Sequence, residues 1–317
     1  MAIIDKSITK AKQILDRNGV IGLPTETVYG LAGNALKATV VAEIFNIKSR
    51  PQFDPLILHC ASLTQLEELI TDFPAKAMQL AKVFWPGPLT LLLPRNNKIP
   101  DITCSGLERA AFRIPNHPLT LNLLKSLDYP LAAPSANPFG YISPTSAQHV
   151  NKQLGDKIPF ILEGQISTVG IESTIVGFED DEVVIYRLGG LEVEAIEKIV
   201  GPAKVMPHSS SSPEAPGMLK SHYAPGKTVI CGNISELINE HKNKKIGVLS
   251  FSDDYSQQSA FSFQLSKEGN MYEAASNLFS FLRKLDSSKV DIILTELVPE
   301  EGLGLAINDR LKRASVN

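Results

Sequence analysis

Helical and extended hydrophobic patterns alternate along this chain of 317 residues, and one segment interrupts the alternation. Apolar residues with helical spacing follow Ser7, and a short apolar stretch at residues 20–23 has the character of a buried strand. Between residues 206 and 226 the pattern gives way to MPHSSSSPEAPGMLKSHYAPG, in which serine, proline and glycine dominate. The chain is therefore predicted to be an α/β protein whose two domains are joined by a linker.

The predicted domains span residues 1–205 and 227–317, on either side of the linker at 206–226. In the first domain, strand patterns at 173–178 and 183–188 form a hairpin, whereas other strands are separated by helices, so a mixed sheet is predicted. In the second domain, strands alternate with helices in the manner of a small Rossmann-like α/β domain.

Composition limits the class of protein. Hydrophobic residues make up 43% and charged residues 21% of the chain, as in an ordinary globular protein. The formal net charge is -3, so affinity for nucleotides has to come from a local cluster of cations. The three cysteines, Cys60, Cys104 and Cys231, include no CxxC pair. With no apolar segment typical of a signal peptide or a membrane span, a cytoplasmic location is expected.

The first candidate site motif is PTETVYGL at residues 24–31, directly after the first predicted strand. Its two threonine hydroxyls and its glycine would let a small ligand approach the backbone closely at a strand end. An ordinary turn would have the same composition. The motif alone does not decide between the two.

Two cations, Lys48 and Arg50, stand at the end of a predicted helix, before Pro51. They either complement the helix dipole or clamp a polyphosphate, for which the forked guanidinium is well suited. His59 lies in an apolar strand, where a histidine is more often a satisfied core residue than a catalyst. Arg113 also lies in an apolar strand, and it requires an anionic partner that is either a protein carboxylate or a substrate.

Two further segments place small polar residues at strand ends. The segment Ala133–Asn137 (APSAN) precedes Ser143-Pro144, which is predicted to begin a helix with Ser143 as its N-cap. Such a strand-to-helix connection can hold phosphate, although Pro-Ser and Asn-Pro turns also occur without a ligand. Across the predicted hairpin, Ser173 and Arg187 are expected near the same end, as a structural contact or as part of a site.

The sequence contains no phosphate loop, no dinucleotide-binding glycine motif, no nucleophile elbow and no HExxH metal motif. From the residues alone we infer a strand-end site rich in hydroxyls and arginine that binds small anions or nucleotides. The reaction itself does not follow from them.

Taken in order, the motifs resemble the YrdC-like family of L-threonylcarbamoyladenylate synthases, in its longer two-domain form. The resemblance covers nearly the whole chain and rests on PTETVYGL, KSRP, FRIP (112–115), APSAN, EST (172–174), HYAP (222–225) and the tail at 278–314. It implies a YrdC-like domain with a twisted mixed sheet around a concave cationic surface, plus the smaller Rossmann-like domain. It also implies an enzyme that joins L-threonine, bicarbonate or CO2, and ATP into threonylcarbamoyl-AMP and pyrophosphate. The product would pass to a threonylcarbamoyl transferase that modifies tRNA.

The resemblance also implies which residues form the site. Threonine would be surrounded by Thr27, His59, Arg113, Ala133 and Ser173, with Arg113 pairing its carboxylate. ATP would be held by Lys48, Arg50, Asp54, Ser135, Asn137, Ser143, Arg187 and Tyr223, with Lys48 and Arg50 as the catalytic cations. Asp54 departs from the family pattern, which has asparagine there, so its contact with ATP is in doubt. Mg²⁺ would arrive with ATP, without a dedicated protein cage.

Two other functions fit parts of the sequence. An RNA-binding module could use the same cationic surface, but the motifs contain few aromatic residues for base stacking. A carbamoyl-transfer enzyme of hydrogenase maturation would be expected to carry acylphosphatase and zinc-finger segments, which this sequence does not show. The linker carries Met218, His222 and Tyr223, residues that a passive spacer does not need, so we expect it to act as a lid as well as a tether.

Overall fold

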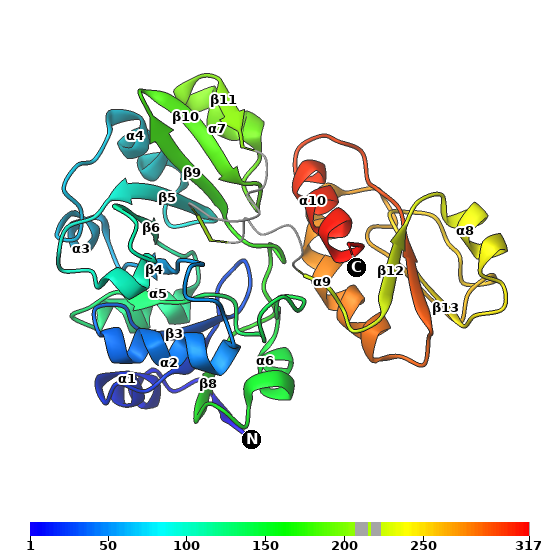
Figure 1. The fold of residues 1–317 in the computed structure, drawn as a ribbon, viewed down its shortest axis with the longest axis horizontal. Coiled ribbons are helices and arrows are strands. Elements are labelled where there is room, and N and C mark those ends of the chain that lie inside the picture. The colour runs from blue at the N-terminus through cyan, green and yellow to red at the C-terminus, as the bar shows by residue number, and fades with distance from the viewer. Residues whose placement is uncertain (207–214, 217–222, 317) are drawn as a thin grey trace.

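The computed structural model describes residues 1–206, 215–216 and 223–316. These residues form two α/β units, each built on a sheet of its own (Figure 1). Most of the linker at 206–226, including Met218 and His222, lies outside the described residues. The lid function expected of the linker therefore stays a prediction.

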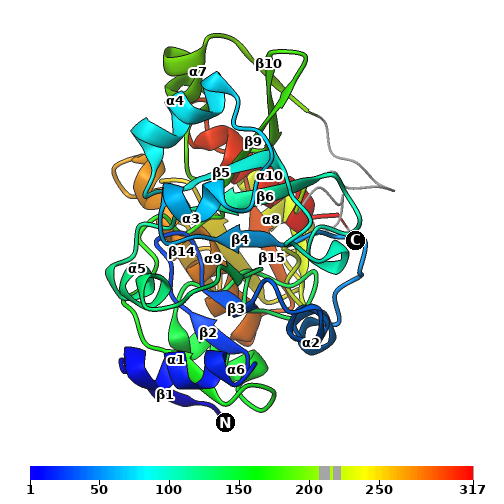
Figure 2. The same ribbon diagram turned by 90° about the vertical axis from the view of Figure 1, so that its left-hand side faces the viewer.

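The first unit contains an 11-stranded sheet in the order β1-β8-β2-β3-β7-β4-β6-β5-β9-β10-β11. Its strands are β1 (Ile3–Asp5), β2 (Ile21–Leu23), β3 (Gly30–Asn34), β4 (Ile57–His59), β5 (Leu89–Pro94), β6 (Arg109–Arg113), β7 (Leu131–Ala132), β8 (Phe160–Leu162), β9 (Thr174–Glu179), β10 (Glu182–Arg187) and β11 (Ala203–Val205). Figure 2 shows their succession from β9 and β5 to β3 and β2. The pairs β4–β6 and β5–β9 are parallel, whereas β2–β3 and β9–β10 are antiparallel, which confirms the predicted mixed sheet.

The helices of this unit include the one predicted after Ser7 and the one predicted to end near Lys48, whereas the helices at Pro118–Lys125 and Val193–Val200 were not predicted. They are α1 (Ile8–Asp16), α2 (Ala38–Lys48), α3 (Leu63–Glu67), α4 (Ala75–Phe84), α5 (Pro118–Lys125), α6 (Ala147–Leu154) and α7 (Val193–Val200), with a 3₁₀ turn at Asp101–Thr103. In α1 the Ser7 hydroxyl accepts a hydrogen bond from the backbone N–H of Lys10, and Ala11 and Leu15 face the core. The predicted helix start at Ser143 is wrong: α6 begins at Ala147, and Ser146 is its N-cap.

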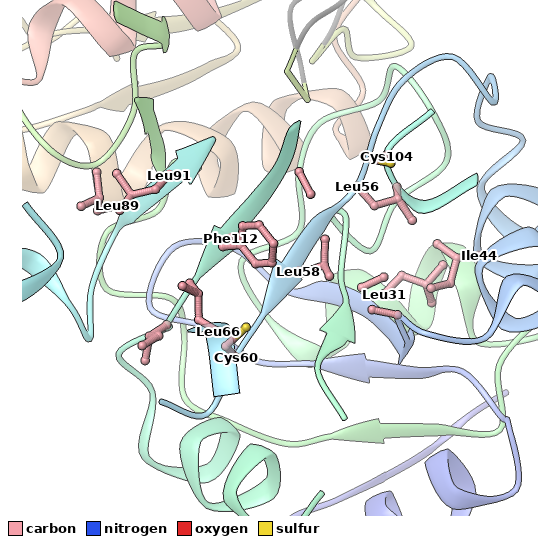
Figure 3. Close-up of a cluster of buried hydrophobic side chains, with 14 of the residues drawn as sticks. Leu31, Ile44, Leu56, Leu58, Cys60, Leu66, Leu89, Leu91, Cys104 and Phe112 are labelled. Atoms are coloured by element: carbon pink, nitrogen blue, oxygen red, sulfur yellow. The ribbon is translucent and has the colours of Figure 1, made fainter. Parts of the chain in front are cut away.

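The main core lies between the sheet and its helices. Leu58 of β4, Leu91 of β5 and Phe112 of β6 are fully buried in one cluster that also contains Leu31 and Ile44 (Figure 3). Burial of large apolar side chains on both faces of the central strands fixes the register of the sheet. It thereby determines where the strand ends, and the site residues on them, are placed.

The second unit is a four-stranded parallel sheet in the order β12-β15-β13-β14. Its elements are β12 (Thr228–Cys231), α8 (Ile234–Glu240), β13 (Ile246–Ser250), β14 (Phe261–Gln264), α9 (Met271–Ser287), β15 (Ile292–Thr295) and α10 (Gly304–Ala314). Alternate strand residues face α9 and α10 on one side of the sheet and α8 on the other. This confirms the predicted Rossmann-like unit. The edge strand β14 was not predicted.

Helices α9 and α10 lie between the small sheet and the first unit (Figure 1). Ile142 and Ile171 of the first unit belong to one buried cluster with Phe279 of α9 and Ile307 of α10. Gly170, with φ +79, allows α9 to approach closely, since a Cβ there would lie 2.4 Å from the Cα of Ser276. The two units therefore share a hydrophobic core.

Candidate active site

The central strands of the large sheet end around an open cavity that is lined by polar and charged side chains. Most of the side chains predicted for the site line it: Thr27, Arg50, His59, Arg113, Ala133, Ser135, Ser173, Arg187 and Tyr223. Lys48, Asp54, Asn137 and Ser143 are not among its lining residues, but they contact residues that are. Residues far apart in the sequence, from Thr27 to Tyr223, therefore lie around the same cavity.

The sequence left open whether Arg113 pairs with a protein carboxylate or with a substrate. In the structure Arg113, at the end of β6, pairs with a protein carboxylate and also lines the cavity. Its Nη2 lies 2.7 Å from the Oε1 of Glu26, and both side chains are more than nine-tenths buried. Its Nη1 donates to the Thr27 hydroxyl at 2.8 Å, while the guanidinium also lines the cavity. Glu26 therefore orients Arg113 and compensates part of its charge. The sequence reasoning missed Glu26, although it is the one acidic residue in PTETVYGL.

The threonine hydroxyls beside Arg113 form a directed chain. The Thr25 hydroxyl donates to the Val28 carbonyl at 2.6 Å, and its oxygen lies 2.8 Å from that of Thr27. Because the Thr25 proton is used in this way, Thr27 donates to Thr25 and accepts from Arg113. The Thr27 side chain is thereby held in one orientation at the cavity wall.

His59, at the end of β4, is a neutral group in this site. Burial, reinforced by the nearby charge of Arg113, lowers the pKa of His59 to about 3. Its Nδ1 lies 3.3 Å from the carbonyl oxygen of Ile57, which favours the tautomer with the proton on Nδ1. The Nε2 atom is then an acceptor, suited to a ligand hydroxyl or amine.

The lowered pKa of His59 predicts a pH effect on stability. As the pH falls from 6.5 toward 3, His59 becomes protonated in the unfolded chain but stays neutral in the folded chain. The free energy of unfolding therefore decreases over this range. Between pH 7 and pH 5, the free energy of unfolding of His59→Gln should fall by about 2 kcal/mol less than that of the wild type. Urea unfolding at both pH values measures this difference. Equal losses in the two proteins would show that His59 is protonated normally.

Arg50 follows α2 and carries a charge toward the cavity. Its Nη2 lies 2.8 Å from the Oδ1 of Asp54 and donates to the Pro55 carbonyl at 2.9 Å, and its Nε donates to the Asp54 carbonyl at 3.0 Å. Asp54 is fully buried behind the guanidinium. The carboxylate that departs from the family pattern is thus paired with Arg50.

Lys48 has a different environment from Arg50, although the two residues were predicted to act together. Its side chain is 1% exposed, and its Nζ donates to the carbonyls of Ser135 and Asn137, at 2.6 Å each. The amide of Asn137 donates to Pro138 and Tyr141. Burial, with the charge of Arg50, holds the pKa of Lys48 well below its usual value. In this structure Lys48 and Asn137 brace the loop that presents Ser135.

Ser173 and Arg187 meet across the β9–β10 hairpin, as predicted. The guanidinium of Arg187 donates to the Ser173 carbonyl through Nε at 3.0 Å and Nη2 at 2.9 Å, and Nη2 also contacts the Ser173 hydroxyl at 3.0 Å. A bulge in the hairpin between Ile185 and Arg187 accompanies this arrangement. Burial lowers the pKa of Arg187 to about 10, so it is still a cation at neutral pH.

Glu172, also missed by the sequence reasoning, lines the cavity beside Ser173. Its Oε1 accepts a hydrogen bond of 2.5 Å from the Ser143 hydroxyl, which explains why Ser143 does not cap a helix. Tyr223 forms the facing wall, with its ring stacked on Phe279 of α9 at a centroid distance of 5.4 Å. The second unit therefore contributes to the surroundings of the cavity.

The charges of the cavity favour anionic ligands. Arg50, Arg113 and Arg187 line it, and Glu172 is the one lining carboxylate among the described residues. Within the same residues, no cluster of three or more histidine, cysteine or acidic side chains could hold a metal ion. Three fixed guanidinium groups, hydroxyls and a neutral histidine can together bind more than one anionic group at once.

Comparison with known proteins identifies the family of this chain. Residues 13–189 match the Sua5/YciO/YrdC family model, described as "Telomere recombination", and residues 191–316 match "Threonylcarbamoyl-AMP synthase, C-terminal domain". The threonylcarbamoyl-AMP synthase of Pyrococcus abyssi is 43% identical, over 93% of this chain and 90% of that protein. The synthase of Bacillus subtilis is 39% identical, over 98% and 93%.

A solved structure agrees with the whole arrangement. The crystal structure of P. abyssi Sua5 complexed with L-threonine superposes with a TM-score of 0.93 at 40% identity, over 99% of this chain and 98% of that one. The match spans both units. This chain belongs to the Sua5/YciO/YrdC family, in a form that also contains the threonylcarbamoyl-AMP synthase C-terminal domain.

Proposed function

We propose that this chain is an L-threonylcarbamoyladenylate synthase. The observation that carries the proposal is the convergence of Arg50, Arg113 and Arg187 with hydroxyls and a neutral histidine on one cavity. The similarity to full-length proteins named threonylcarbamoyl-AMP synthase, and to Sua5 bound to L-threonine, supports it. The substrates are L-threonine, bicarbonate or CO2, and ATP.

The threonine subsite is the part of the cavity around Arg113. Its guanidinium pairs the amino-acid carboxylate, Thr27 and Ser173 supply hydroxyls, and Ala133 leaves room for the side chain. His59 Nε2, which is unprotonated at neutral pH, accepts a hydrogen bond from the threonine hydroxyl or amine. Glu26 holds Arg113 in place from behind.

The nucleotide subsite lies toward Arg50, Ser135, Arg187 and Tyr223. The two guanidinium groups neutralise the triphosphate, and Lys48 and Asn137 act by bracing the loop of Ser135. Asp54 acts through Arg50, and Ser143 acts through Glu172. Mg²⁺ enters with ATP, bound to phosphate oxygens and water.

The reaction requires positioning more than a strong protein base. The amine of threonine combines with CO2 and loses a proton, giving a carbamate. A carbamate oxygen attacks the α-phosphorus of ATP, and the bond to the β-phosphate oxygen breaks, releasing pyrophosphate. Three anionic groups meet in this step, so fixed cations and orientation supply most of the rate enhancement. The mixed anhydride then passes to a threonylcarbamoyl transferase acting on tRNA.

The alternative of an RNA-binding module fits the cavity less well. Tyr223 is 1% exposed and packed against Phe279, so its ring is not available as a stacking platform for bases. Contact with tRNA is therefore indirect, through the transferase.

None of the helices in the described part of the chain combines the length and apolar character needed to cross a bilayer. We propose a cytoplasmic location on functional grounds, since tRNA modification takes place there.

Exchange of labelled pyrophosphate into ATP tests the proposed reaction. Exchange should require L-threonine and bicarbonate together, and omitting either should reduce it to background. Serine and allo-threonine are matched controls for the threonine subsite. Exchange without threonine, or none with every substrate present in a folded protein that binds ATP, would contradict the proposed function.

A further inference from the structure

Arg310 is a fully buried cation supplied by α10 of the second unit. Its Nη2 lies 3.1 Å from the Oε2 of Glu172, and its Nη1 donates to the Leu188 carbonyl at 2.6 Å and to Asp309 at 2.9 Å. Its guanidinium carbon lies 5.2 Å from the centre of the Tyr223 ring. Its Nε also donates to the Oε2 of Glu172, at 3.3 Å, so Arg310 links α10 to the cavity wall.

Glu172 presents an electrostatic problem for a nucleotide site. It lines the cavity together with Arg187, yet a carboxylate there repels a triphosphate. Its Oε1 accepts from Ser143, a neutral hydroxyl that cannot compensate its charge. Arg310 is the cation that pairs with its other oxygen, at a burial where an unpaired charge is costly.

Besides Glu172, Arg310 contacts the Leu188 carbonyl and the Tyr223 ring. The Leu188 carbonyl that accepts from Nη1 belongs to the residue after Arg187. Ser143 is oriented through Glu172, and the Tyr223 ring lies against the guanidinium. Each of these neighbours belongs to the nucleotide side of the cavity, whereas Arg113 and Thr27 have their own partners in the first unit.

We propose that Arg310 is a positioning residue for ATP: the second unit supplies the counter-ion that makes Glu172 compatible with a bound triphosphate. This inference rests on the proposed function, because it presupposes a nucleotide in the cavity. The second unit is then a working part of the nucleotide subsite. It orients Ser143 and the segment of Arg187 and neutralises the carboxylate between them.

Charge suppression tests the proposal in the full-length chain. Arg310→Met leaves Glu172 without its cation, so affinity for a non-hydrolysable ATP analogue should fall about 10- to 100-fold, with threonine affinity changed less than threefold. Removing the carboxylate as well, in Arg310→Met/Glu172→Gln, should restore most of the lost ATP affinity, since glutamine can still accept from Ser143. Calorimetric titration with each ligand measures both affinities.

A purely structural role would give a different pattern. The matched control is Asn308→Ala, which removes a buried side chain of the same helix that exchanges two hydrogen bonds with the Val298 backbone. It should lower the melting temperature but leave ATP affinity unchanged. Arg310→Lys, which keeps the charge, should bind ATP more tightly than Arg310→Met. If Arg310→Met fails to fold, the double variant Arg310→Met/Glu172→Gln, which leaves no unpaired carboxylate, still tests the proposal, because it should bind ATP nearly as tightly as the wild type.

The outcomes separate this inference from the proposed function. ATP affinity of wild-type strength in Arg310→Met, no recovery in the double variant, or an equal loss in Arg310→Lys would overturn the role of Arg310. A folded wild-type protein that binds neither the ATP analogue nor threonine would instead contradict the proposed function.

Discussion

Replacing Arg113 by alanine should raise the KM for threonine far more than the KM for ATP. The variant loses a charge-assisted contact with the amino-acid carboxylate, and it leaves Glu26 as a buried carboxylate facing the subsite. A loss of this kind costs about 2–4 kcal/mol, or roughly 30- to 1000-fold in KM for threonine. Steady-state kinetics with each substrate varied in turn measures the two effects separately.

The double variant Arg113→Ala/Glu26→Gln controls for the unpaired charge. It should fold more stably than Arg113→Ala, because the buried carboxylate is neutralised, yet it should still have a raised KM for threonine. If both KM values rise equally in a variant that melts at the wild-type temperature, Arg113 does not bind the threonine carboxylate.

Replacing Arg50 by lysine should impair the use of ATP even though the charge is retained. The guanidinium holds the carbonyls of Asp54 and Pro55 while it faces the cavity, and an ammonium group cannot reproduce this fork. Losing hydrogen bonds to a charged group costs about 1.5–3 kcal/mol, so we expect a decrease of roughly 10- to 150-fold in kcat/KM for ATP. The KM for threonine should change little.

Arg95→Lys is the matched control. Arg95 also donates to two backbone carbonyls, those of Leu107 and Ile99, and pairs with Asp101, but it does not line the cavity. Its replacement by lysine should leave kcat/KM for ATP at the wild-type value. Full activity of Arg50→Lys would mean that a point charge is sufficient there.

Local patterns in the sequence were enough to predict most elements near the site. The helix after Ser7 and the hairpin of β9 and β10 depend on a capping hydroxyl, hydrophobic period and a short turn. The contact between Ser173 and Arg187 followed from that hairpin. These features are set by residues close together in the chain, so they can be inferred before the fold is known.

Other assignments depended on partners that are distant in sequence. Ser143 is in the sequence context of an N-cap, but Glu172, 29 residues away, accepts a hydrogen bond from its hydroxyl. Lys48 is at a position typical of a helix-end cation, yet its ammonium group is buried and donates hydrogen bonds to the carbonyls of Ser135 and Asn137. A side chain with several possible partners takes the one that tertiary packing brings within reach, and local pattern cannot rank those partners.

The sequence by itself determined the mixed sheet and the Rossmann-like second unit, because hydrophobic period and turn chemistry are local, and the order of its motifs supplied the resemblance that implied the site residues. Only the tertiary structure decided how the charges are paired. It placed Glu26 behind Arg113, Asp54 behind Arg50, and Arg310 of the second unit against Glu172. A counter-ion lowers the cost of burying a charge, and two of these three pairs join residues more than 80 positions apart, so that folding alone brings them together.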